Sequence, residues 1–297
     1  RIEEDGSFAH GMTNPLDIVA QRRSGPGIRS AVVSVICGES AFDEAVGIYF
    51  SSRGKLRDAR EDYAKARPSY HPDLVDRFVS RYGDGVVVDL GAGTGIFTGQ
   101  LIEAGCSPIA IEPFAAMRRQ LTVDHPDVSV LDGTAEDTGL PASSVDCVVV
   151  AQAFHWFHHA DALREIHRIL RPGGHLVCVW NVRDETVQWV KEFTDIVDRH
   201  AGNTPRHRTM DWRRAIDADA QFEAVDDWSV PNPTATTPDD VVDRALSTSF
   251  IAALDHQRQQ QVLEEARAMA QAVGDRFEFP YRSELQAWRR VPRTAGE

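Results

Sequence analysis

Short apolar runs alternate with amphipathic segments along residues 58–291 of the chain. Runs that are rich in valine and isoleucine and bounded by polar residues are typical of strands buried in a parallel sheet. The pattern predicts seven such strands, at Val86–Leu90, Pro108–Ile111, Val128–Leu131, Val145–Ala151, His175–Trp180, Phe222–Val230 and Leu285–Trp288.

The segments between these runs carry apolar residues at helical spacing. In Ala160–Leu170, Leu163, Ile166 and Ile169 fall on one side, and the RPGG at 171–174 ends the helix. Further helices are predicted at Asp58–His71, Leu74–Arg81, Thr94–Ala104, Pro113–Thr122, Glu185–His200, Asp239–Leu254 and His256–Ala272. Five successive strand–helix units predict an α/β fold, a Rossmann-like, seven-stranded and mostly parallel sheet with helices on both faces.

Three boundaries divide the chain. Residues 1–57 show no regular pattern, and we interpret them as an irregular amino-terminal arm or an over-extended reading frame. Residues 58–291 form the predicted domain, and 292–297 form a tail. Within the domain, 232–276 is predicted to be a helical cap insertion, because helices added late in a sheet are candidates for a lid over the substrate.

Composition narrows the classes of function. The formal net charge of −13 argues against a nucleic-acid substrate, because phosphate backbones are bound by clustered Lys and Arg and the sequence has no such cluster. No apolar run approaches the roughly 20 residues of a membrane span. The four cysteines (Cys37, Cys106, Cys147 and Cys178) are far apart and form no CxxC pair, so reduced thiols are expected. We expect a cytoplasmic protein that binds neither membranes nor nucleic acids.

The glycine-rich stretch VVVDLGAGTG, residues 86–95, is the strongest candidate for chemistry. Gly91 and Gly93 lack a Cβ, so a ligand can approach the backbone, and the following helix directs its free N–H groups to the same place. A dinucleotide site would need its third glycine later, but position 96 is Ile96. The loop therefore predicts a nucleotide-type ligand without deciding which one.

Glu112 follows the second predicted strand, about twenty positions after Gly91. A carboxylate with that spacing accepts hydrogen bonds from a ribose diol. The alternative is that Glu112 only caps the helix that begins near Pro113.

Polar residues also follow the other predicted strands. Thr134, Ala135 and Glu136 suit a loop whose amides bond the edge of an adenine ring, although an ordinary polar loop has the same composition. Ligands of open α/β sheets lie over the carboxyl ends of the strands. Five residues are expected at those ends: Asp89, Glu112, Thr134, Gln152 and Asn181.

The segment QAFHWFHH after the fourth strand alternates aromatic residues with histidines. His155, His158 and His159 would share one face of a helix and could hold a metal, but no further ligand pattern completes a site. We expect no metal, and instead that Phe154 and Trp156 pack while His155 points into the cleft.

Tyr63, Arg67 and Tyr70 stand out in the charged segment before the first strand. The helix that carries them either lies over the ligand, with Arg67 pairing a carboxylate, or is an exposed helix with extended side chains.

Several stretches together resemble a known family. DLGAGTG, AIEP, GTAE, VDCVVVAQAFHWF and LREIHRILRPGGHLVCVWN, with the leading YAKARPSY, resemble the small-molecule branch of the class I S-adenosylmethionine-dependent methyltransferases, near the methyltransferase type 11 and trans-aconitate methyltransferase-like proteins. The resemblance covers about residues 58–291. It does not cover the amino-terminal arm.

The resemblance implies a role for each matching residue. The glycine loop with Asp89 cradles the methionine part, Glu112 holds the ribose, Thr134 to Glu136 frame the adenine, and Gln152 lies beside the methyl group. Thr134 stands where many relatives carry an aspartate, which puts that adenine contact in doubt. The residues expected to bind the cofactor are Tyr63, Arg67, Asp89, Gly91, Ala92, Gly93, Glu112, Pro113, Thr134, Ala135, Glu136, Ala151 and Gln152.

The resemblance also implies methyl transfer to an acceptor. AQAFHW occupies the place of the Asn/Asp-Pro-Pro-Tyr signature of base- and amide-directed enzymes, so we expect a small organic acceptor with a carboxylate or hydroxyl group. His155 is the candidate catalytic residue, unless it only packs against Trp156, and Trp156 and Arg183 are the candidate acceptor-binding residues. The alternatives are a nicotinamide-dependent oxidoreductase, disfavoured by the glycine spacing, and a non-catalytic cofactor-binding domain.

Overall fold

The computed structural model describes residues 68–291 of the chain. The predicted arm over 1–57, the tail over 292–297 and most of the predicted helix Asp58–His71 lie outside the described residues, as do Tyr63, Arg67 and Cys37.

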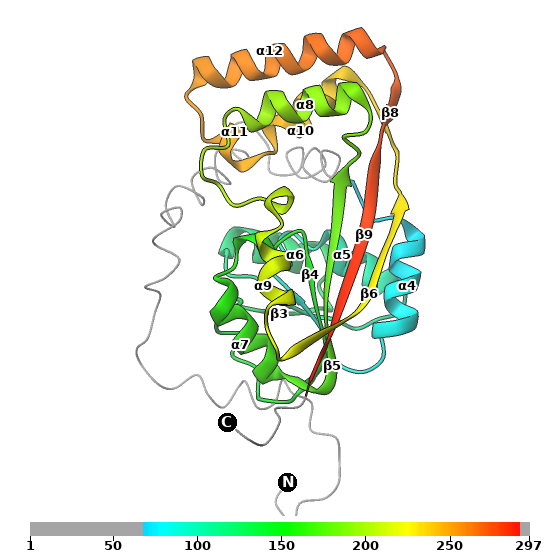
Figure 1. Cartoon of the computed structure of the whole chain (residues 1–297), viewed down its shortest axis with the longest axis vertical. Helices are drawn as coiled ribbons and strands as arrows, with labels where there is room; N and C mark the ends of the chain where they lie inside the picture. The colour runs from blue at the N-terminus through cyan, green and yellow to red at the C-terminus, as the bar shows by residue number, and fades with distance from the viewer. Residues whose placement is uncertain (1–67, 292–297) are drawn as a thin grey trace, which may run out of the picture.

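One twisted sheet of seven strands forms the centre of the described part (Figure 1). Its strands in chain order are β1 (Val87–Leu90), β2 (Ile109–Ile111), β3 (Ser129–Leu131), β4 (Val145–Ala151), β5 (Leu170–Arg183), β6 (Phe222–Pro231) and β9 (Tyr281–Arg290). The spatial order is β3-β2-β1-β4-β5-β9-β6. Only β9 runs against its neighbours. The predicted Rossmann-like, mostly parallel sheet is confirmed.

Alternate side chains of the sheet point to two separate helical layers. Val87 contributes to an apolar cluster with α4 and α5, whereas Val88 contributes to a cluster with α7 and α9. Period-two alternation of this kind is what a strand buried on both faces produces. The helices are α4 (Pro72–Tyr82), α5 (Ile96–Glu103), α6 (Ala115–Asp124), α7 (His159–Ile169) and α9 (Asp211–Asp217).

Strand β5 begins earlier than its apolar run suggests. It was expected to start at His175, but it pairs with β4 from Leu170 onward, with a register shift between Val145 and Cys147. The irregularity accommodates the RPGG segment, in which Gly173 has φ +78°.

Helix α9 was missed because only Trp212 and Ile216 of its seven residues are buried apolar side chains. Such a short segment shows no helical period. A second small sheet was also missed. It pairs β7 (Thr234–Thr236) with β8 (Phe277–Phe279).

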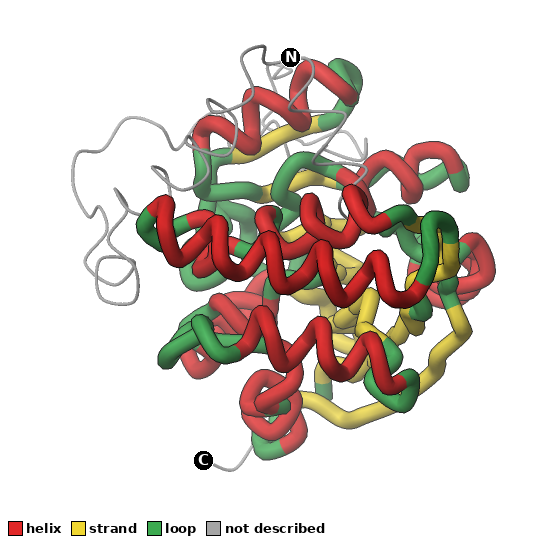
Figure 2. Tube along the Cα trace, turned by 90° about the horizontal axis from the view of Figure 1, so that it is seen from above, coloured by secondary structure: helices red, strands yellow, loops and turns green. Residues whose placement is uncertain are grey.

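Four helices lie over the carboxyl ends of the strands and form the cap layer: α8 (Gln188–Asp198), α10 (Pro238–Leu246), α11 (Ser249–Ala252) and α12 (His256–Val273). Figure 1 shows them gathered at one end, reached by β5 and β9, and Figure 2 views them from above. A third apolar cluster, distinct from those of the sheet, fills this layer. It includes α8, which precedes the predicted cap over 232–276, and that boundary stays a prediction. None of the described helices, α12 included, is both long and apolar enough to cross a membrane.

Candidate active site

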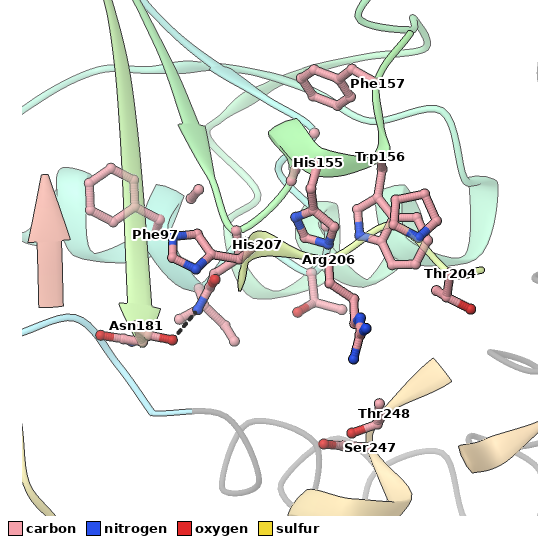
Figure 3. A pocket seen from close by; sticks show the side chains of 18 of the residues that line it. Phe97, His155, Trp156, Phe157, Asn181, Thr204, Arg206, His207, Ser247 and Thr248 are labelled. Carbon is pink, nitrogen blue, oxygen red and sulfur yellow. Dashed lines mark hydrogen bonds between the residues drawn. The ribbon is translucent and has the colours of Figure 1, made fainter. Parts of the chain in front are cut away.

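A cavity of about 600 Å³ lies between the strand ends and the cap layer. Its walls include the glycine loop, the β2 end, the segment after β4 and residues of α8, α10 and α11. Figure 3 shows His155 and Trp156 on one side of this space, with Ser247 and Thr248 of the cap layer facing them. Pockets of this size accommodate small molecules.

The glycine loop leaves its backbone open to the cavity. Gly91 and Gly93 have φ angles of +73° and +60°, a conformation that glycine adopts without strain. A Cβ on Gly93 would meet no atom nearer than Met117 Sδ at 4.0 Å, whereas a Cβ on Gly91 would point at the Cβ of Ala153, 3.0 Å away. The N–H groups of Gly91 and Ala92 both donate to the Ile111 carbonyl, which fastens the loop to the end of β2.

Glu112 is the buried acid of this wall, with 3% of its surface exposed. Its Oε2 accepts from Gly93 N and its Oε1 from Phe114 N, each at 2.9 Å. Burial raises the pKa of Glu112, and these two hydrogen bonds oppose that shift. Glu112 therefore bonds the backbone of Phe114, the residue just before α6, and not an N–H group within the helix that the capping alternative requires. The ribose contact stays a prediction, and each oxygen keeps a second lone pair for it.

Asp89 lies behind the wall rather than on it. Its side chain is fully buried and its Oδ2 accepts from Thr98 Oγ1 at 2.6 Å, while Oδ1 has no hydrogen-bond partner. Burial raises the pKa of Asp89 to about 7. It does not line the cavity, so its place here is that of a support between β1 and α5.

Two hydrogen bonds from backbone N–H groups to side chains hold the predicted adenine loop in place. Thr134, Ala135 and Glu136 all line the cavity, next to Pro113. Thr134 Oγ1 accepts from Asp137 N at 3.1 Å, and Glu136 Oε1 accepts from His158 N at 2.9 Å. The Thr134 side chain is therefore already engaged by its own turn.

Gln152 also lines the cavity, as does Ala151. It is one of three described non-glycine residues with positive φ, here +57°, and such a conformation at a strand end often marks a functional position. Its Nε2 donates to the Asn181 carbonyl at 3.0 Å, which is the dashed bond of Figure 3. The side chain thereby bridges β4 and β5.

His155 lies in a short 3-10 helix, Phe154–Trp156, and lines the cavity. Its ring centre is 4.9 Å from that of Trp156 and 5.6 Å from that of Trp180. Phe154 is fully buried, as expected, but Trp156 is 38% exposed and lines the cavity instead of packing inside. The segment is too short for both aromatic residues to face the core.

The three histidines of this segment do not share a helix face. His155 belongs to the 3-10 helix, His158 precedes α7 and pairs with Asp161 at 2.7 Å, and His159 stacks on Phe154. Among residues 68–291, no group of three or more His, Cys, Asp or Glu side chains is arranged to hold a metal ion.

Arg183 ends β5 and lines the cavity, as its predicted role requires. Its guanidinium carbon lies 4.6 Å from the centre of the Phe193 ring. Within the described part it has no ion pair, so its charge is available to a ligand.

Sequence reasoning missed most of the cap side of the cavity. Burial lowers the pKa of His207 to about 4, so this cavity-lining imidazole is neutral at pH 7. Arg206 pairs with Asp198 at 2.7 Å, and Figure 3 shows it reaching toward the cap. Arg244 of α10 was also missed, although a cation among the apolar residues Val241, Val242 and Ala245 could have signalled it. His207 and Arg206 lie in a polar connection without such a signal.

Comparison with known proteins identifies the family. Residues 88–178 match the family described as methyltransferase domain. An uncharacterized methyltransferase of Mycobacterium bovis is 36% identical over 207 residues, 70% of this chain and 82% of that protein. The chain belongs to the class I S-adenosylmethionine-dependent methyltransferases. This family membership rules out the alternative stated from the sequence, a nicotinamide-dependent oxidoreductase.

Other proteins similar to this methyltransferase are also described as methyltransferases. A methyltransferase-like protein of Schizosaccharomyces pombe is 31% identical over 216 residues, 71% of this chain and 84% of that one. A putative type II methyltransferase from Anaeromyxobacter dehalogenans superposes with a TM-score of 0.58 at 24% identity, covering 76% of this chain and 99% of that one. A putative methyltransferase from an antibiotic biosynthesis pathway of Anabaena variabilis superposes with a TM-score of 0.54 at 20% identity, covering 74% of this chain and 98% of that one. The two structures share the fold.

The family match has a definite position on the methyltransferase. It runs from β1 into β5 and so includes the glycine loop, Glu112, Gln152 and His155. Arg183, His207 and Arg244 fall outside it. The family match thus covers the strand-end side of the cavity, and the cap side lies outside that match.

Proposed function

We propose that this methyltransferase transfers the methyl group of S-adenosylmethionine to a small organic acceptor, at a carboxylate or hydroxyl group, inside the cavity between the strand ends and the cap layer. The observation that carries the proposal is that one cavity is lined both by the glycine loop with Glu112 and by polar side chains of the cap layer. Donor and acceptor can therefore meet there.

The wall fits the cofactor. Gly93 has no Cβ, and the nearest atom in that direction is Met117 Sδ at 4.0 Å, which leaves room for a ligand against the backbone. In the proposed arrangement, the loop from Gly91 to Gly93 holds the methionine part, Glu112 accepts from the ribose, and Thr134 to Glu136 frame the adenine. When bound, S-adenosylmethionine supplies an electrophilic methyl carbon on a sulfonium.

The acceptor side then has two tasks. The chain must hold the nucleophile in line with the methyl group and keep water out. The imidazole of His155 can take a proton from a hydroxyl or donate a hydrogen bond to a carboxylate. Arg183 supplies a cation to an acidic acceptor, and the fact that it forms no ion pair within residues 68–291 favours the carboxylate alternative.

Calorimetric titration followed by turnover tests the proposal. We expect S-adenosylmethionine to bind and NAD not to bind, and methyl transfer to appear in a library of small carboxylic and hydroxy acids. Failure to bind S-adenosylmethionine would contradict the cofactor site, and binding without turnover of any small acceptor would contradict the acceptor class.

A further inference from the structure

We propose that Arg244 is the receptor for an anionic group of the acceptor that does not itself react. The inference rests on the proposed function for the identity of its occupant. It adds to that function a second point of recognition, in the cap layer, and therefore a class of acceptor: a molecule with a carboxylate or phosphate remote from the methylated atom.

Arg244 is buried but incompletely bonded. Only 4% of its surface is exposed. Its Nη2 donates to Thr234 Oγ1 at 3.0 Å and Thr236 Oγ1 at 3.2 Å. Its Nε and Nη1 are buried without a hydrogen-bond partner. Buried donors are nearly always satisfied in a finished structure, so these N–H groups indicate a missing acceptor.

The charge of Arg244 is also uncompensated. Its guanidinium carbon lies 4.9 Å from the Phe279 ring centre and 5.3 Å from that of Tyr281, but within residues 68–291 no carboxylate pairs with it. Contacts with aromatic rings restore only part of the hydration that a buried cation loses. A purely structural role would leave the desolvation cost of this cation without compensation, whereas an anionic ligand would offset that cost and accept from the free N–H groups.

The arginines that line the cavity differ in whether a carboxylate pairs with them. Arg206 and Arg208 also line the cavity, and both pair with Asp198. Arg183 and Arg244 line it without an acidic partner in the part of the chain that the structure describes. Two uncompensated cations in one cavity favour an acidic ligand over a neutral one.

The position of Arg244 sets where the anion lies. It belongs to α10 on the cap side, immediately before the cavity-lining Ser247 and Thr248. Figure 3 shows these two residues across the space from His155 and Trp156. An acceptor with its reacting atom near His155 would thus extend its other end toward the cap.

The test uses the full chain saturated with S-adenosylhomocysteine and three probes: glutarate, inorganic phosphate and the neutral analogue glutaramide. Each is titrated calorimetrically into the parent, Arg244→Met, Arg244→Lys and Arg258→Met. Arg258 is the matched control, because it is an exposed cap-layer arginine paired with Asp255. The affinity for S-adenosylhomocysteine reports that each variant is folded.

We expect glutarate or phosphate to bind the parent, and the preferred probe identifies the anion as carboxylate or phosphoryl. Arg244→Met should weaken that binding about 10- to 100-fold, Arg244→Lys should weaken it less, and Arg258→Met should leave it unchanged. Affinity for S-adenosylhomocysteine should stay within about twofold of the parent in all variants, since Arg244 lies on the cap side.

Equal anion affinity in the parent and Arg244→Met would overturn the proposal, as would glutaramide binding as tightly as glutarate. A parent that fails to bind S-adenosylhomocysteine overturns the proposed function instead. The glutarate and phosphate titrations, repeated without it, still decide the role of Arg244.

Discussion

Glu112 has an observed structural role and a proposed ligand-binding role. Each carboxylate oxygen accepts one backbone N–H, from Gly93 or Phe114, and this fixes both the loop and the start of α6. The same oxygens border the cavity. Substitution therefore has to distinguish loss of shape from loss of a ligand contact.

Glu112→Gln is expected to weaken S-adenosylmethionine binding by about 1.5–3 kcal/mol, because it removes a charged acceptor from the ribose. Calorimetric titration measures this. Glu103→Gln, on the exposed end of α5, is the control and should bind like the parent. Parent-like affinity of Glu112→Gln would leave Glu112 with its two backbone hydrogen bonds alone.

His155 is the other residue whose role a single substitution resolves. If the acceptor is a hydroxyl, His155→Gln should lower turnover about 10²- to 10⁴-fold, since a general base is lost. If the acceptor is a carboxylate, the effect should appear mainly in its KM. The exposed His256→Gln is the control. Unchanged acceptor kinetics in His155→Gln would remove the residue from the mechanism.

At the level of elements, the contact between Asp89 and Thr98 joins β1 to α5 directly beneath the glycine loop. The position of the loop therefore depends on how this strand and helix are held together. Because burial raises the pKa of Asp89 to about 7, the contact depends on pH.

The raised pKa predicts how stability changes with pH. The folded chain binds the Asp89 proton more tightly than the unfolded chain, whose value is near 3.8. The contribution of protonated Asp89 to the free energy of unfolding is fully present below about pH 4 and is lost as the pH rises through 7. The loss is on the order of 4 kcal/mol, at about 1.36 kcal/mol per pKa unit.

Urea unfolding of the parent and Asp89→Asn between pH 4 and 8 measures this difference. The parent should lose stability relative to Asp89→Asn across that range, and the exposed Asp84→Asn should run parallel to the parent. A constant difference between the parent and Asp89→Asn would show that Asp89 does not titrate there.

The elements also show how far the sequence could be interpreted. The strands and the glycine loop were predictable because their patterns are local: valine runs, glycines at a turn, and an acid at a strand end. Helix α9 was not, since its two buried apolar residues show no period. The unpaired state of Arg244 was not predictable either, because it depends on which carboxylates the cap layer brings near, and that follows from long-range packing.

At the scale of residues 68–291 as a whole, the proposed donor and acceptor sides of the cavity rest on different apolar clusters. The sheet packs two apolar clusters, and α8, α10 and α12 pack a third with Phe279 and Tyr281. A change inside the third core should therefore affect the acceptor more than the cofactor.

Ala266→Leu tests this separation. Ala266 is fully buried on α12, and overpacking it should cost about 1–3 kcal/mol of stability and displace the cap helices. We expect a raised KM for the acceptor and an S-adenosylmethionine affinity within about twofold of the parent. Ala268→Leu, on the exposed face of the same helix, should change neither. Equal losses of both affinities would contradict separate cores.

The third apolar cluster, in the cap layer, also has a consequence for how the protein can evolve. A lineage can alter the cap residues proposed to choose the acceptor while the proposed donor site keeps its packing, since the cap helices pack an apolar cluster of their own. Substitutions in the cap layer then accumulate at low cost to the donor site. New acceptor preferences can then arise while the donor site stays unchanged, which makes the cap layer the natural place to redesign the enzyme.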